Sequence, residues 1–95
     1  MSPLGQLIED VRADFEQREG VPLSYAAIAR RGGEVMGRKR VFTMVSKPIK
    51  DLPAPETLRA LAKGLGVPYS IVLEKALLSA GYELPRSDDQ TRKIG

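Results

Sequence analysis

Residues 24–46 read SYAAIARRGGEVMGRKRVFTMVS, and they contain two short helical segments separated by a glycine-rich connection. Ser24 is a suitable cap for a helix over residues 25–31, which the glycine pair that follows should end. A second helix is predicted over residues 38–46, before Pro48. Two short helices joined by a tight glycine-containing connection, the second with Arg and Lys in its first turn, are the parts of a helix-turn-helix unit.

The remaining sequence predicts three more helices, because apolar residues recur at helical spacing. Ser2 and Pro3 can start one that covers about residues 3–19 and stops before Gly20. Pro55 can start another that stops at Gly64 or Gly66, and the last begins near residue 69 and stops by Gly81. The residues expected to point inward along these helices are Leu4, Leu7, Ile8, Val11, Phe15, Leu58, Leu61, Ala62, Leu65, Tyr69, Val72, Leu73, Ala76, Leu77 and Ala80.

The length favours one small domain, and the five predicted helices make it all-α, a compact five-helix bundle. We assign it to residues 1–83 and expect residues 84–95 to form a flexible polar tail. The 95 residues include no Cys and no His, which excludes disulfides, thiolate ligands and imidazole catalysis. Glu9, Asp10 and Asp14 are read as solvated carboxylates on the outer face of the first helix. We therefore predict no catalytic residues, no metal site and no cofactor.

The positive charge of this chain is concentrated in one segment. Residues 30–50 hold seven basic residues and one acid, Glu34, which gives +6, whereas the whole chain carries +3 and the rest therefore sums to −3. A concentrated basic patch attracts polyanions to one face, as expected of a nucleic-acid-binding protein. On charge alone, a solvated basic loop is an equal alternative.

In order and spacing, three stretches together resemble the Cro/C1-type (XRE-like) helix-turn-helix regulators of phages and bacteria. They are SYAAIARRGG, RKRVFTMV and PAPETLRALAKGLGVPYSIVLEKAL, and the resemblance covers about residues 4–78. It implies a lambda-repressor-like DNA-binding domain and a transcriptional regulator, most plausibly a phage or prophage repressor. Its partner would be double-stranded operator DNA, and neither a membrane nor a small-molecule substrate is expected. The location would be cytoplasmic, on the nucleoid.

The resemblance also implies roles for individual residues. Ala29 would let the two helices cross, and Val41 and Met44, with Val45 as an alternative to Met44, would point inward. The base-contact candidates are Arg38, Lys39 and Thr43. The phosphate-contact candidates are Ser24, Tyr25, Arg30, Arg31, Arg40, Ser46, Lys47 and Lys50. The connection over residues 33–41 is longer than is usual in the family, which leaves the register of Arg38 to Arg40 open by one position.

The role of Arg38 has an alternative, and Phe42 beside the basic residues has two possible roles. Arg38 can donate to guanine O6 and N7, or it can position the protein through a phosphate, since half or more of protein–DNA contacts go to the backbone. Phe42 could pack against a thymine methyl group, although a partly buried core position is favoured by the usual burial of phenylalanine.

The last predicted helix has more apolar residues than one core face needs. Ile71, Leu78 and Tyr82 recur on a neighbouring face. They are candidates for a homodimer interface that would place two recognition helices one turn of DNA apart. The alternative is a broad core face covered by the first helix or by the tail.

Two other functions stay open. One is a helical protein-interaction adaptor, an antitoxin-like or anti-repressor-like module that uses its basic patch on an acidic protein partner. The other, a small nuclease, is disfavoured because the chain has no His and no carboxylate cluster.

Overall fold

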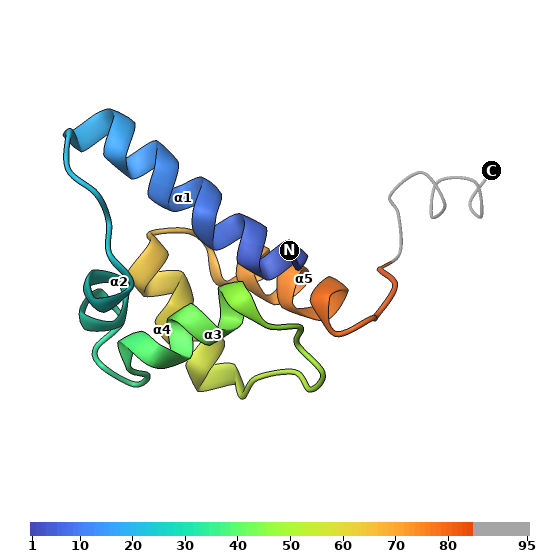
Figure 1. Cartoon of the computed structure of the whole chain (residues 1–95). Helices are drawn as coiled ribbons and strands as arrows, with labels where there is room; N and C mark the ends of the chain where they lie inside the picture. The colour runs from blue at the N-terminus through green and yellow to red at the C-terminus, as the bar shows by residue number, and fades with distance from the viewer. Residues whose placement is uncertain (85–95) are drawn as a thin grey trace.

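The computed structural model describes residues 1–84, which form five α-helices and no strand (Figure 1). The helices are α1 (Pro3–Glu19), α2 (Tyr25–Arg31), α3 (Arg38–Ser46), α4 (Pro55–Leu65) and α5 (Tyr69–Ser79). The bounds predicted for the first three helices are confirmed, and so is the all-α class. None of the described helices is long and apolar enough to cross a membrane. The predicted flexible tail falls almost wholly on residues 85–95, outside the described residues.

The first helix begins and ends where the sequence places its caps. The backbone N–H of Gly5 donates to the Ser2 hydroxyl oxygen over 3.0 Å, and Gly20 ends α1 in the left-handed conformation at φ 75°. The N–H of Leu4 donates to Ser79 Oγ over 2.8 Å, which fixes the first turn of α1 against the end of α5. Two backbone donors that a helix start would leave unpaired are thereby satisfied.

All five helices contribute to one core. Helix α2 packs on α3 and α4, α1 packs on α3 and α5, and α4 packs on α5 (Figure 1). The largest fully buried side chains are Leu4, Ile8, Ile28, Val41, Leu58, Leu61 and Val72. Leu7, Val11 and Phe15, also predicted to point inward, pack half-buried at the edge of this core.

The contact between α2 and α4 is a close approach of two backbones. A methyl group on Gly64 would overlap the carbonyl oxygen of Ile28, and one on Gly32 would lie 2.5 Å from the carbonyl oxygen of Ala60. Gly64 is therefore not a helix end, as the sequence allowed, but a buried residue inside α4. The helix ends instead at Gly66, which adopts φ 73°.

Replacing Gly64 by alanine should destabilise the fold. Alanine favours a helix by about 1 kcal/mol over glycine, whereas overpacking costs about 1–3 kcal/mol and here forces two backbones apart. We expect a net loss of about 1–2 kcal/mol and a melting temperature lower by roughly 4–15 °C. Thermal unfolding followed by circular dichroism measures the change. Lys63→Ala, an exposed change in the same helix, is the control, and a Gly64→Ala variant as stable as this control would contradict the close crossing.

Candidate nucleic-acid interface

Helix α3 buries one side and exposes the other. Val41 and Met44 are 0% and 3% exposed, as predicted, and Val45 packs against the core from a half-buried position. Successive helical residues are about 100° apart, so the opposite side is formed by four residues. We call this side the α3 face; its residues are Lys39, Phe42, Thr43 and Ser46, of which only Thr43 is half-buried.

Cationic side chains lie on both flanks of the α3 face. On one flank, Arg30 of α2 and Arg38 line a shallow depression with Glu34. On the other flank, Arg40 and Lys50 line a groove between α3 and the segment that leads to α4. The two sets come from opposite edges of α3, because the helical turn places Arg38 and Arg40 about 200° apart.

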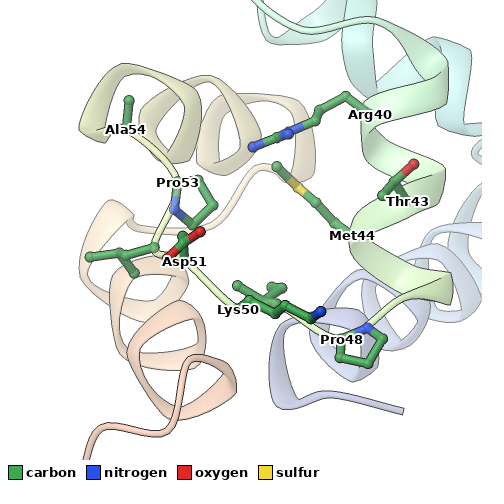
Figure 2. Close-up of a pocket in the computed structure, with 10 residues that line it drawn as sticks. Arg40, Thr43, Met44, Pro48, Lys50, Asp51, Pro53 and Ala54 are labelled. Atoms are coloured by element: carbon green, nitrogen blue, oxygen red, sulfur yellow. The ribbon is translucent and has the colours of Figure 1, made fainter.

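Figure 2 shows the groove on the second flank. Arg40 reaches from α3 across the groove, over the side chain of Met44, and Lys50 lies on the other side near Pro48. Ile49 and Leu52 add apolar lining, and Asp51 is the one carboxylate among the lining residues. An extended anionic chain with apolar sugar edges would find both kinds of contact here.

These basic residues are not neutralised by the rest of the described chain. Within residues 1–84 the ion pairs are Arg12–Glu9 and Arg18–Asp14, both on α1. All seven basic residues of residues 30–50 are exposed. Their charge is therefore available to a partner.

Arg31 differs from the other six in its direction. Its guanidinium lies 5.6 Å from the centroid of the Phe15 ring of α1. A methyl group on Gly66 would lie 3.4 Å from its Nη2 atom. The structure thus turns Arg31 toward α1 and the end of α4, away from the other six basic residues, and its phosphate contact stays a prediction.

Hydroxyl groups on α3 are bonded to the helix backbone. Thr43 Oγ1 donates to the Lys39 carbonyl over 2.8 Å, and Ser46 Oγ donates to the Phe42 carbonyl over 2.9 Å. Each oxygen can still accept, but neither can donate to a phosphate in this rotamer. Ser24 differs, because its oxygen accepts from the Ala27 N–H over 3.0 Å and its hydroxyl proton stays free to donate.

The Tyr25 hydroxyl, a predicted phosphate contact, is used inside the protein. It donates to Glu9 Oε2 over 3.0 Å and accepts from Arg12 Nη1 over 3.2 Å. Arg12 also donates to Glu9 Oε1 over 2.7 Å and to the Leu23 carbonyl over 2.8 Å, and its guanidinium lies 4.2 Å from the centroid of the Tyr25 ring. A phosphate here would meet the Glu9 carboxylate, so the assignment of Tyr25 does not fit. Glu9, expected to be only solvated, holds this network together.

Phe42 also departs from expectation. The residue was expected to be a partly buried part of the core, but it is 52% exposed and belongs to the α3 face. Its ring touches the Tyr25 ring edge-on, with centroids 5.8 Å apart and planes at 61°. The sequence alone could not separate the two readings, because Phe42 follows the buried Val41 directly.

The residues proposed for the dimer surface do not all lie on α5, because the helix ends at Ser79 and Tyr82 follows it, and they are only partly free. Ile71 and Tyr82 are 37% and 58% exposed, whereas Leu78 is half-buried. Ile71 and Tyr82 could thus meet a second copy, and the dimer stays a prediction. Among the described residues, no three acidic side chains lie close enough together to hold a metal ion.

We compared the chain with known protein families, curated proteins and solved structures. No protein-family model, no curated protein and no solved structure matches this chain. The relation to Cro-type regulators therefore stays a prediction from the sequence, and the α3 face has to be interpreted from its own geometry.

The Tyr25 network predicts a dependence of stability on alkaline pH. Burial, and then the hydrogen bond to Glu9, raise the pKa of Tyr25 above its ordinary value of 10.0. A group whose pKa is raised on folding contributes stability that is complete below its unfolded pKa and is lost as the pH rises through the folded pKa. The unfolding free energy of the wild type should therefore fall as the pH rises above about 10, and that of Tyr25→Phe should fall less.

Urea unfolding at several pH values measures this difference. Near pH 7, Tyr25→Phe should cost about 1 kcal/mol for the lost hydrogen bond. The control is Tyr82→Phe, because Tyr82 is 58% exposed. Equal alkaline losses in Tyr25→Phe and the wild type would rule out a stabilising role for the Tyr25 hydroxyl.

Proposed function

We propose that this chain is a sequence-specific double-stranded DNA-binding protein that regulates transcription. The observation that carries the proposal is the placement of unpaired cations on both flanks of one exposed helix face. Arg30 and Arg38 lie on one side of α3, and Arg40 and Lys50 lie on the other.

This placement suits the major groove. The groove is about 12 Å wide, admits one α-helix, and is bordered by a phosphate strand on each side. With α3 in the groove, the α3 face would meet the base edges and each flank would meet one phosphate strand. Helix α2, which packs on α3, would then be the first helix of a helix-turn-helix unit, with Ser24 as a further phosphate donor.

The kind of regulator follows from the sequence resemblance. Its order of motifs supports a phage or prophage repressor of the Cro or immunity-repressor type. The adaptor with an acidic protein partner is the second candidate, because the same exposed cations would also attract clustered carboxylates. The two candidates differ in what the cations must match: the two phosphate backbones that border the major groove, or an acidic protein surface.

Binding to duplex DNA should weaken steeply with salt, because bound cations release counterions from the phosphates. If about four of the seven basic residues engage, the slope of log affinity against log salt should be near −4 per protomer. Fluorescence anisotropy with a labelled random duplex measures the slope, and unlabelled duplex and polyglutamate serve as competitors. A flat dependence, or displacement by polyglutamate as effective as by DNA, would favour the adaptor.

Specificity should depend on Lys39 more than on any cation away from α3. Lys39 lies in the middle of the α3 face, whereas Lys63 is exposed on α4. Lys39→Gln should lower the preference for a selected site over random DNA by roughly 5- to 100-fold, the effect of losing one base contact. Lys63→Gln makes the same charge change and should leave that preference unaltered.

The same measurement resolves the two roles left open for Arg38. A base contact would make Arg38→Gln lower the preference, whereas a phosphate contact would make it weaken specific and random binding equally. If Lys39→Gln and Lys63→Gln behave alike, the orientation proposed for α3 is wrong.

A further inference from the structure

An aromatic side chain occupies the α3 face among polar residues. Phe42 is 52% exposed, although the adjacent Val41 is 0% exposed. Its neighbours on the face are Lys39, Thr43 and Ser46. A single exposed apolar residue is common on protein surfaces, so exposure alone assigns no role.

The second observation is that the Phe42 ring packs against another aromatic side chain, that of Tyr25 on α2. The Tyr25 ring meets it edge-on at 5.8 Å, an arrangement that aromatic pairs favour. Tyr25 is in turn fixed by its hydrogen bonds with Glu9 and Arg12. The contact limits the rotamers open to Phe42 while half of its surface still faces outward. A ring ordered in advance loses little further entropy when a ligand covers it.

The ligand chemistry follows from what the major groove displays. Its base edges are donors and acceptors with one apolar exception, the 5-methyl group of thymine. We infer that Phe42 recognises a thymine through this methyl group and that Tyr25 positions the ring for it. The inference rests on the proposed function and adds to it an apolar contact with one base, which the charged and hydrogen-bonding residues do not supply.

Removing the methyl group from DNA tests the inference directly. Each thymine of a selected duplex is replaced in turn by deoxyuridine, which keeps the hydrogen-bonding edge and loses only the methyl group. At one position the wild type should bind about three- to fivefold more weakly, the effect of uncovering one methyl group. Phe42→Ala should bind both duplexes equally. Circular dichroism should show Phe42→Ala to be folded, since exposed substitutions change stability little.

Thr43→Ser is the matched control, because it deletes the other methyl group of the α3 face and keeps the hydroxyl. It should preserve the difference between thymine and deoxyuridine. Three results would refute the role of Phe42 while duplex binding itself stands. They are a Thr43→Ser variant that no longer distinguishes thymine from deoxyuridine, a Phe42→Ala variant that still does, and a wild type that distinguishes them at no position.

Absence of duplex binding would overturn the proposed function and this inference with it. Tighter, Phe42-dependent binding to single-stranded DNA would instead identify base stacking and also refute methyl recognition.

Discussion

The crossing of α2 and α4 at Gly32 and Gly64 positions α2, on which the interface helix α3 packs. Helix α2 has seven residues, too few to be stable as an isolated helix. Its stability depends on tertiary contact, and in one close contact the missing side chain of Gly64 lets the backbone of α4 reach the carbonyl of Ile28. Helix α3 packs on α2 and is thereby placed as well. A change of one methyl group at this crossing would shift both helices.

Positive and negative charges lie on different surfaces of the molecule. Six of the seven basic residues of residues 30–50 lie on or beside α3, whereas the exposed surface of α1 carries Asp10, Asp14 and Glu16. A polyanion is attracted by the first surface and repelled by the second. The modest net charge of +3 therefore understates the field near α3. This asymmetric charge would orient an anionic partner toward α3 before the two molecules touch.

The sequence predicted the helix ends well because local chemistry determines them. Ser2, Pro3, Gly20 and Ser24 act through hydrogen bonds and backbone angles of their own segment. The inward positions of Val41 and Met44 were predictable for the same reason, because one helical period orders them.

The features that the sequence did not predict depend on residues far away in the chain or on hydrogen bonds that compete for the same group. Gly64 became a crossing point because Ile28 lies opposite, and Tyr25 lost its free hydroxyl to Glu9, sixteen positions away. Thr43 and Ser46 were outward, as expected, yet their protons went to the backbone one turn earlier. The residue types predicted which side chains lie on the surface. Hydrogen bonds inside the protein determine which of their polar groups can still bind a partner.

Helix α3 is weakly supported by its own sequence. Its first turn holds Arg38, Lys39 and Arg40, where the helix dipole favours negative charge, and Gly37 provides no side-chain cap. Each unfavourable charge costs about 0.3–1 kcal/mol, and burial of Val41 and Met44 has to offset that cost. An anion bound beside this turn would remove part of the repulsion. Local rules are most often broken at functional sites, and here the break lies at the end of α3 that would enter the groove. The feature that weakens the free helix is thus the one that DNA would stabilise under the proposed function.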